Sequence, residues 1–176
     1  MDYLKYSGEQ SADGASVVKL YRAAFPRSER RPWPDLVDKL RTSNGVFNLD
    51  CWMNYGSFVG FISYWLLDDV VYVEHFAVED RYRGCGMGAD ILRCFKERFP
   101  DRPIVLEVEK PFSNDMASRR IGFYRRHGFE VVSTEYLQPP YHEDEDMLPL
   151  DLMATAPIDV PRVSRLIHTN VYGVDE

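Results

Sequence analysis

The residues of this sequence with the clearest chemistry form a basic, glycine-rich segment at 81–88, Arg-Tyr-Arg-Gly-Cys-Gly-Met-Gly. Gly84, Gly86 and Gly88 alternate with other residues, which lets the backbone approach an anion closely and directs successive N–H groups toward it. A helical pattern begins directly after them, and a helix N-terminus carries about half a positive charge. The spacing therefore predicts a loop that holds a phosphate group.

Two nucleotide-binding motifs also use glycine-rich segments, and neither fits this one. A P-loop has Gly-Lys-Ser/Thr at the start of the helix, where this chain has Gly88-Ala89-Asp90. A Rossmann loop comes early in a βαβ unit, not after a series of consecutive strands. A turn without a ligand is the remaining alternative, although a turn needs only one glycine and each glycine costs up to about 1 kcal/mol of backbone entropy.

The elements around the loop follow from hydrophobic periodicity and from turn residues. A strand ends directly before the loop, and Ala89, Ile91, Leu92, Phe95 and Phe99 repeat at helical spacing after it. Gly128 is expected to end another helix, and Asp159 to begin a short C-terminal one. The predicted strands are 46–53, 57–66, 70–78, 104–109, 129–137 and 147–153, and the main helices are 15–25, the segment between residues 34 and 43, and 115–127.

Length, charge and composition limit the class of protein. The 176 residues fit one compact domain, and 21 basic against 28 acidic residues give a net charge of −7, which disfavours nucleic acid as a partner. No apolar run or leader pattern predicts a membrane segment or a signal peptide, so we expect a cytoplasmic protein. Three cysteines without C-x-x-C spacing and four scattered histidines predict neither disulfides nor a metal site.

Two motifs carry a resemblance to a known family. Residues 83–88 resemble the Arg/Gln-x-x-Gly-x-Gly/Ala signature of the GNAT superfamily of acetyl-CoA-dependent N-acetyltransferases, in the matching place after a strand. Residues 106–108, Leu-Glu-Val, and then 123–129, Phe-Tyr-Arg-Arg-His-Gly-Phe, resemble the second GNAT motif, in which a helix with a tyrosine ends in Gly-Phe. The segments 136–141 and 149–153 resemble those of general bacterial members, and the whole resemblance spans about residues 15–153.

The resemblance implies an α/β (α+β) fold, a mixed, largely antiparallel twisted sheet flanked by helices. It implies a single acetyltransferase domain over 1–156, with 157–176 as a short C-terminal helix and tail. The implied activity transfers an acetyl group from acetyl-CoA, a co-substrate, to a primary amine of a small-molecule or peptide acceptor, by direct attack through a tetrahedral intermediate. We expect a monomer or homodimer without metal, nucleic acid or membrane. A catalytically idle CoA-binding or regulatory module is the alternative.

The resemblance also assigns residues to the cofactor. A strand would pair its backbone with the pantetheine arm, and the loop with the first residue of the next helix would hold the pyrophosphate. Many family members carry an asparagine seven residues before the catalytic tyrosine, but here that position is Ala117 and the nearest asparagine, Asn114, also suits a helix cap. The implied cofactor residues are Phe76, Ala77, Val78, Arg83, Gly84, Cys85, Gly86, Met87, Gly88 and Ala89, with Asn114 as a further candidate.

Three residues are candidates for acid–base catalysis. The resemblance places Tyr124 at the sulfur of the cofactor, where a phenol with a pKa of about 10 stays protonated at neutral pH and can protonate the leaving thiolate. The acceptor amine must lose a proton, so a carboxylate is the natural general base. Glu107 matches the position of the base in some family members, and Glu74 lies on the strand before the loop, on the face of Phe76 and Val78. The sequence leaves the choice between them open.

Overall fold

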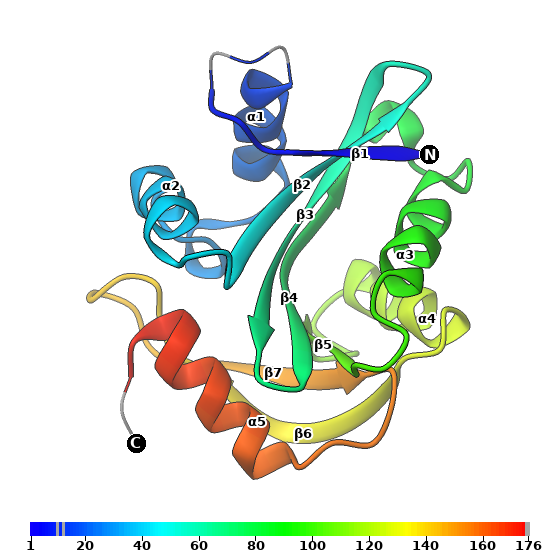
Figure 1. Ribbon diagram of the computed structural model, residues 1–176. Helices are drawn as coiled ribbons and strands as arrows, with labels where there is room; N and C mark the ends of the chain where they lie inside the picture. Colours follow the sequence, from blue (N-terminus) through cyan, green and yellow to red (C-terminus); the bar gives the residue numbers. More distant parts are fainter. Residues whose placement is uncertain (10, 12, 175–176) are drawn as a thin grey trace. The chain divides into compact units, whose positions relative to one another are not determined.

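The computed structural model describes residues 1–9, 11 and 13–174 of the chain. Seven strands are hydrogen-bonded in the order β1-β2-β3-β4-β5-β7-β6 (Figure 1). β4 and β5 pair in parallel, whereas β1 with β2, β2 with β3, β5 with β7 and β6 with β7 pair antiparallel. The predicted mixed, largely antiparallel sheet flanked by helices is therefore confirmed.

Contacts divide the chain into two compact units, Met1–Trp65 with Glu74–Arg98, and Leu66–Val73 with Phe99–Glu176. The strands β3 and β4 contribute residues to both units. A single domain over 1–156 remains a prediction.

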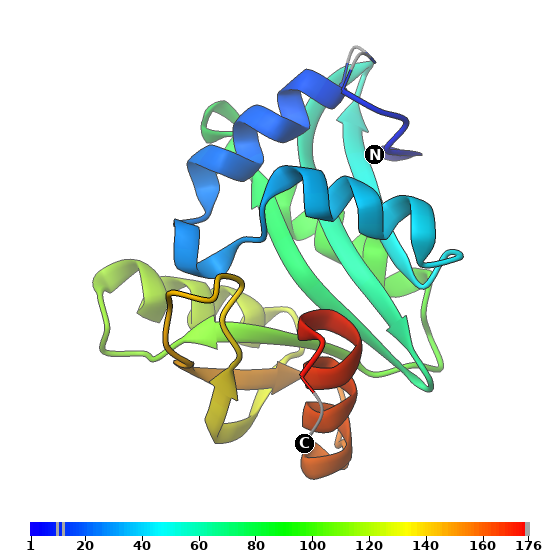
Figure 2. The same cartoon turned by 90° about the vertical axis from the view of Figure 1, so that its left-hand side faces the viewer.

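In the described part of the chain, the first unit holds β1 and β2, most of β3, part of β4, three helices and two short 3-10 helices. Figures 1 and 2 show α1 and α2 on one face of its strands, and Figure 1 shows α3 on the other. Val17 and Tyr21 of α1 and Leu36 of α2 are fully buried, so the apolar stripes predicted from the sequence face the strands. The elements are β1 (Asp2–Lys5), α1 (Gly14–Ala24), η1 (Arg27–Glu29), α2 (Trp33–Thr42), β2 (Phe47–Asn54), β3 (Ser57–Leu67), β4 (Val70–Val78), η2 (Asp80–Tyr82) and α3 (Met87–Glu97).

A buried carboxylate joins three elements of this unit. Asp50 of β2 is fully buried, accepts a hydrogen bond from Arg98, just after α3, at 2.6 Å, and forms an ion pair with Lys5 of β1, whose Nζ lies 2.7 Å from Oδ1. The Arg98 guanidinium also lies 4.0 Å from the centre of the Tyr3 ring. Since a buried charge is tolerated only when it is paired, these contacts fix the end of α3 and the first strand against β2.

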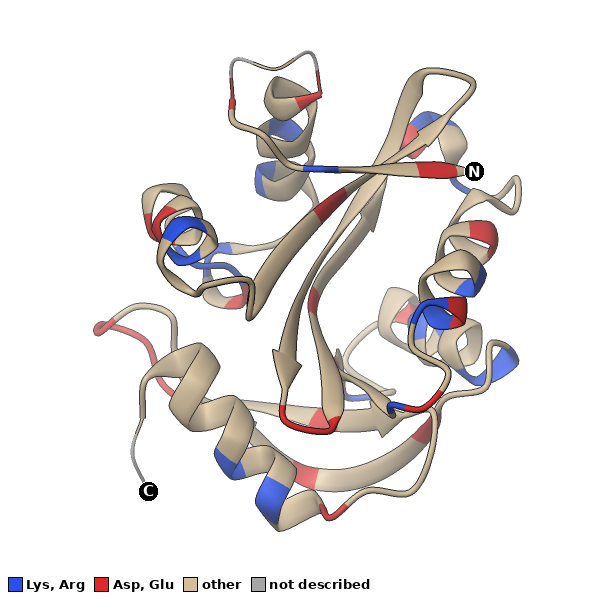
Figure 3. Ribbon diagram, in the orientation of Figure 1, with Lys and Arg blue, Asp and Glu red and all other residues tan. Residues whose placement is uncertain are grey.

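The second unit holds β5 (Ile104–Glu109), α4 (Asp115–Arg126), β6 (Glu130–Gln138), β7 (Leu148–Ala154), α5 (Val160–Ile167) and the π-helix η3 (His168–Tyr172). Helix α4 packs against β5 and α5 against β6. The predicted cap is present, because the Asp159 side chain accepts from the backbone N–H of Arg162 at 3.1 Å. Figure 3 shows acidic residues along the loop between β6 and β7, which contains residues 143–146.

The strands and helices predicted with stated bounds are present, with ends within two residues of the prediction. The π-helix η3 was not predicted. It follows α5 without a break and ends at Gly173, whose φ of 72° lies in the left-handed region. A single π-turn leaves no periodic signal in the sequence, because its i→i+5 bonds span only five residues.

Candidate functional site

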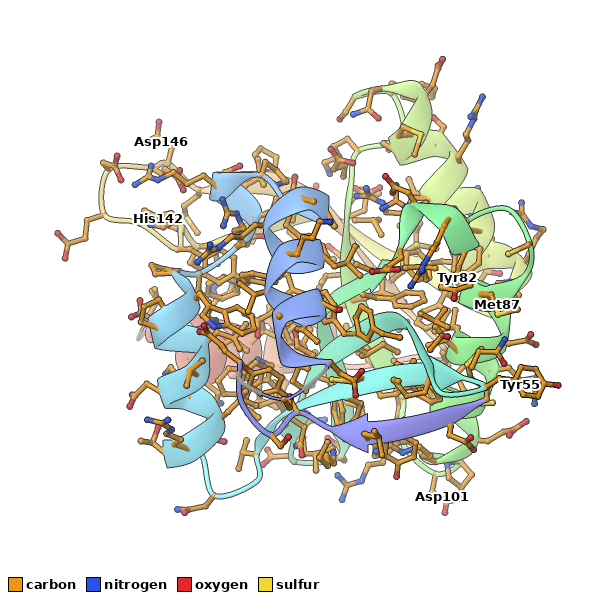
Figure 4. The ribbon with its side chains drawn as sticks, turned by 90° about the horizontal axis from the view of Figure 1, so that it is seen from above. Tyr55, Tyr82, Met87, Asp101, His142 and Asp146 are labelled. Carbon is orange, nitrogen blue, oxygen red and sulfur yellow. The ribbon has the colours of Figure 1, made fainter. Side chains whose placement is uncertain are left out.

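The glycine-rich loop of the first unit is a turn that requires glycine. Gly84 and Gly86 have φ values of 74° and 87°, in the region that side chains disfavour. Gly86 is the N-cap residue of α3, so the helix begins at Met87, two residues before the Ala89 start implied by the resemblance. Tyr82 and Met87, labelled in Figure 4, are the residues before and after the loop segment 83–86 in the chain.

Helix geometry supplies the donors of this loop. The N–H of Asp90 bonds to Gly86 O at 3.1 Å, the first such bond of α3, so the N–H groups of Met87, Gly88 and Ala89 are the N-terminal donors of an 11-residue helix. The Arg83 side chain is anchored to the residues before the loop, because its Nε donates to Val78 O at 3.0 Å and its Nη1 forms an ion pair with Asp80 Oδ1 at 2.8 Å. The loop thus combines backbone donors with a helix N-terminus, which together suit an anion, and its Arg83 cation is paired with Asp80.

The strand before the loop leaves part of its backbone beyond the parallel pairing with β5. The register pairs are Val71 with Ile104, Tyr72 with Val105 and Val73 with Leu106, whereas β4 runs on to Val78. Phe76 and Val78 are half-buried and Ala77 is buried. An added Cβ at Gly60 of β3 would meet the backbone of Ala77, so glycine allows β3 to approach β4 closely here.

Glu74 belongs to a buried ion pair in the first unit. Its side chain is 0% exposed, and Arg31, whose side chain is 6% exposed, donates to Oε1 through Nη2 at 2.5 Å and through Nε at 2.9 Å. Trp65 Nε1 donates to Oε2 at 2.6 Å. Burial alone would raise the pKa of Glu74, but the Arg31 charge and the hydrogen bonds from Trp65 and Arg31 hold it below its ordinary value. The carboxylate is therefore held ionised, with both oxygens engaged.

His75, next to Glu74, is a neutral buried histidine. Its Nε2 lies 3.0 Å from the carbonyl of Glu29, which can only accept, so this nitrogen carries the proton. Its Nδ1 then accepts from Ser63 Oγ at 3.0 Å. Burial lowers the pKa of His75 to about 4, although the Glu74 charge acts in the opposite direction.

This pKa predicts that the protein loses stability in mild acid. In the unfolded chain His75 binds a proton below about pH 6.5, whereas in the folded chain it does so only below about pH 4. The contribution of His75 to the free energy of unfolding is therefore complete above about pH 6.5 and decreases as the pH falls from about 6.5 to about 4. Between pH 7 and pH 5 the free energy of unfolding should fall by about 2 kcal/mol from this group. Denaturant unfolding at both pH values measures it. In His75→Gln the difference between the two pH values should largely disappear, and an undiminished difference would assign the effect to other groups.

In the second unit, the end of α4 fixes Tyr124. The N–H of Phe129 bonds to Tyr124 O at 3.1 Å and that of Gly128 to Arg125 O at 3.1 Å, and Gly128 has a φ of 82°. This is a Schellman motif, whose apolar contact is the packing of the Tyr124 and Phe129 rings with centroids 5.4 Å apart. The Gly-Phe pair therefore sets where the tyrosine lies. Burial raises the pKa of Tyr124 to about 12 against the charge of Arg120, so the phenol keeps its proton at neutral pH.

Asn114 is the N-cap residue of the same helix. Its Oδ1 accepts from the backbone N–H of Ala117 at 2.8 Å, the capping role that the sequence also allowed. Its amide lies 3.5 Å from Glu109 Oε1. The geometry thus gives this side chain a structural role.

Glu107 lies on β5 and is half-buried. Tyr172 of η3 donates a hydrogen bond to Glu107 Oε2 at 3.0 Å, and the hydroxyls of Tyr72 and Tyr141 each lie 3.3 Å from that of Tyr172. Sequence reasoning missed these three tyrosines. They come from the end of the β3–β4 hairpin, the β6–β7 loop and the C-terminal π-helix, so no local pattern connects them.

Two further features are absent from the described residues. In the ranges 1–9, 11 and 13–174 no group of three or more His, Cys, Asp and Glu side chains is arranged to hold a metal ion. No helix in this described part of the chain is long and apolar enough to cross a membrane.

Comparison with known proteins decides the family. The sequence profile of the acetyltransferase (GNAT) family matches residues 15–129, and a solved structure described as a GNAT-family acetyltransferase from Bacteroides thetaiotaomicron is 35% identical. The chain belongs to the GNAT acetyltransferase family. The Bacteroides structure superimposes with a TM-score of 0.90, and the match covers 99% of this chain and 100% of that one. No curated protein matches the chain significantly.

More distant solved structures share the fold. The ribosomal-protein-S18-alanine N-acetyltransferase from Escherichia coli is 18% identical, with a TM-score of 0.57 over 90% of this chain and 97% of that chain. A GNAT family acetyltransferase from Elizabethkingia anophelis, solved with acetyl-CoA bound, is 12% identical, with a TM-score of 0.57 over 89% of this chain and 97% of that chain. The GNAT resemblance inferred from the two motifs is therefore confirmed, and the protein is an acetyltransferase by family.

Proposed function

We propose that this GNAT protein is an N-acetyltransferase that moves an acetyl group from acetyl-CoA to a primary amine of a small molecule or peptide. The observation that carries the proposal is the glycine loop, whose left-handed Gly84 and Gly86 lead into the N-terminal donors of α3. The relatives support both halves of the reaction, since one of the same fold was solved with acetyl-CoA and another is named for an amine acceptor, an alanine.

For the cofactor, residues of the first unit supply the contacts. The N–H groups of Met87, Gly88 and Ala89 hold the pyrophosphate together with the backbone of residues 83–86, and Arg83 adds a positive charge. The backbone of residues 76–78, beyond the paired part of β4, binds the pantetheine arm as a further strand would. Asn114 is not assigned to the cofactor in this proposal, because its side chain caps α4. When bound, acetyl-CoA supplies the activated thioester.

Replacing Gly86 tests the phosphate loop. Gly86→Val should weaken acetyl-CoA binding about tenfold or more, because a β-branched side chain disfavours a φ of 87° and its Cβ obstructs the backbone approach to the pyrophosphate. Isothermal titration calorimetry measures the affinity. Gly45→Val is the matched control, since Gly45 has a φ of 83° and, like Gly86, no heavy atom within 4 Å of an added Cβ. Equal affinities for the two variants would contradict the assignment.

Tyr124 is proposed as the general acid. The amine attacks the thioester directly through a tetrahedral intermediate, and the phenol of Tyr124, with a pKa of about 12, gives its proton to the departing sulfur. Its place at the end of α4 is set by Gly128 and Phe129 and not by its hydroxyl.

Tyr124→Phe should therefore bind acetyl-CoA as tightly as the parent and turn over about 10²-fold more slowly, because only the transition state uses the proton. The phenylalanine ring keeps the contact with Phe129. Steady-state rates of thiol release, together with the calorimetric affinity, measure both quantities. A variant that is as fast as the parent, with chemistry limiting, would assign the acid to another group or to water.

Glu107 is proposed as the general base in preference to Glu74. A base must accept a proton from the acceptor ammonium, and Glu74 is a weak candidate because Arg31 and Trp65 occupy both of its oxygens and its pKa is lowered. The hydrogen bond that Glu107 receives from Tyr172 comes from a neutral phenol. We assign Glu74 to the stability of the first unit.

One assay tests the proposed function as a whole. The protein is incubated with acetyl-CoA and a panel of primary amines that includes polyamines, amino sugars and peptides with free N-termini, while thiol release is followed. Release with at least one amine, absent when the amine is N-methylated to a quaternary salt, supports the proposal. Acetyl-CoA binding without release for any amine would instead favour a CoA-binding module.

A further inference from the structure

The C-terminal π-helix places a hydroxyl against the proposed base. Tyr172, the last residue of η3, donates to Glu107 Oε2 at 3.0 Å although the two residues are 65 positions apart. Both residues lie in the second unit. Since the π-helix η3 is held by other contacts, a phenol placed on a carboxylate calls for a role of its own.

The direction of the hydrogen bonds around Tyr172 follows from its single proton. A phenol has one O–H, and Tyr172 gives it to Glu107, so the neighbouring hydroxyls of Tyr141 and Tyr72 must be donors to the Tyr172 oxygen, each at 3.3 Å. A hydroxyl that accepts hydrogen bonds becomes a better donor, because each bond polarises the next. The two outer tyrosines therefore strengthen the bond from Tyr172 to the carboxylate.

The protonation state of this cluster is fixed by its surroundings. Burial raises the pKa of Tyr172 well above 10, and the charge of Glu107 and the other tyrosines act in the same direction. The titratable groups that act on Tyr172 come from β5, the β6–β7 loop, β4 and β6, and they are Glu107, Tyr141, Tyr72 and Tyr136. The donor is thus present throughout the neutral pH range.

Several contacts hold Tyr172 in place. His168, at the start of η3, lies with Nε2 3.0 Å from Leu137 O, and its ring packs against that of Tyr136 in a tilted arrangement, with centroids 5.4 Å apart. At the other end, the N–H of Val174 bonds to His168 O at 3.0 Å after the left-handed Gly173. The rings of Tyr141 and Tyr172 pack with centroids 5.0 Å apart. The side chain is therefore set on a fixed element.

We propose that Tyr172 is a positioning residue for the general base. Its hydrogen bond fixes the orientation of the Glu107 carboxylate and favours the ionised form of that carboxylate, and Tyr141 supports it by donating to the Tyr172 oxygen. This inference rests on the proposed function, in which Glu107 accepts the proton of the acceptor amine. A donor to a carboxylate stabilises the charged form, so its loss should make Glu107 easier to protonate and disable the base at a higher pH.

The test compares the parent, Tyr172→Phe and Tyr141→Phe in two measurements. In the first, a carbon-13 NMR titration without any acceptor follows the glutamate carboxyl carbons, with Glu107 assigned from the spectrum of Glu107→Gln. Tyr172→Phe should raise the titration midpoint of Glu107 by about one pH unit, and Tyr141→Phe by less. Tyr55→Phe, at a side chain that is 99% exposed on the β2–β3 turn and points outward in Figure 4, should leave it unchanged.

In the second measurement, kcat/KM for the fastest amine of the panel is followed against pH. In Tyr172→Phe the acidic limb of the kcat/KM profile should move to higher pH by about one unit, so that kcat/KM below the midpoint is about tenfold lower than in the parent. The KM for acetyl-CoA should not change. In a Glu107→Gln background Tyr172→Phe should cause no further loss. The inference would be overturned if Tyr172→Phe left the NMR midpoint of Glu107 unchanged, or if it lowered kcat/KM as much in the Glu107→Gln background as in the parent. If no amine releases thiol the proposed function fails, while the NMR titration still decides whether Tyr172 acts on Glu107.

Discussion

Glu107→Gln is expected to lower kcat by about 10²-fold or more while it leaves acetyl-CoA affinity unchanged. The amide has the shape of the carboxylate and can still accept from Tyr172, whose donated bond is 3.0 Å long, so the fold around β5 should be retained. What the amide lacks is a lone pair basic enough to take a proton from an ammonium group. Steady-state thiol release at saturating acetyl-CoA, with calorimetry of cofactor binding, measures both parts of the prediction.

Glu74→Gln is the matched control, because it makes the same change at the competing carboxylate. It should keep the turnover of the folded enzyme within a few-fold of the parent but lower its stability, since it removes one charge of the buried pair with Arg31. Circular dichroism during denaturant unfolding measures the second effect. The opposite pattern, with turnover lost in Glu74→Gln and kept in Glu107→Gln, would exchange the two roles.

The parts of the site that the sequence predicts well are those that depend on neighbours in the chain. The glycine loop is one, because the positive φ values at Gly84 and Gly86 are a local backbone requirement. The end of α4 is another, since the Schellman motif involves only residues 124–129. The alternation of β4 also emerged from the sequence, with Glu74, Phe76 and Val78 on one face and buried His75 between them.

The parts that sequence patterns do not reach are the partners from distant segments. Glu74 looked as suitable a base as Glu107 until the structure placed Arg31, 43 residues away, on its carboxylate. Alternation gives the face of a strand on which a side chain lies but not the groups that another element brings to it. The same applies to Tyr172 and Glu107, which are 65 positions apart and meet only in the folded chain.

The buried pair of Arg31 and Glu74 leads to the largest expected effect on stability. Arg31→Met keeps an apolar side chain against the rings of Phe47 and Trp65, which lie 5.9 and 5.7 Å from the guanidinium, but leaves the Glu74 carboxylate buried without its cation. The free energy of unfolding at pH 7 should fall by about 3–5 kcal/mol. Arg31 holds the pKa of Glu74 below its ordinary 4.5, so the pair contributes its stability above pH 4.5, and the loss should shrink as the pH falls below that value.

Two further variants separate this effect from a loss of packing. Arg162→Met removes a guanidinium 2.6 Å from Asp69, but that pair lies in solvent, and exposed pairs contribute little, so no resolvable change is expected. Arg31→Met combined with Glu74→Gln removes both buried charges, and it should recover much of the stability lost in Arg31→Met alone, because most of that loss comes from the unpaired carboxylate and not from the absent contact. If the double variant were no more stable than Arg31→Met, the Arg31 guanidinium would stabilise the fold through its packing and not through its charge on Glu74.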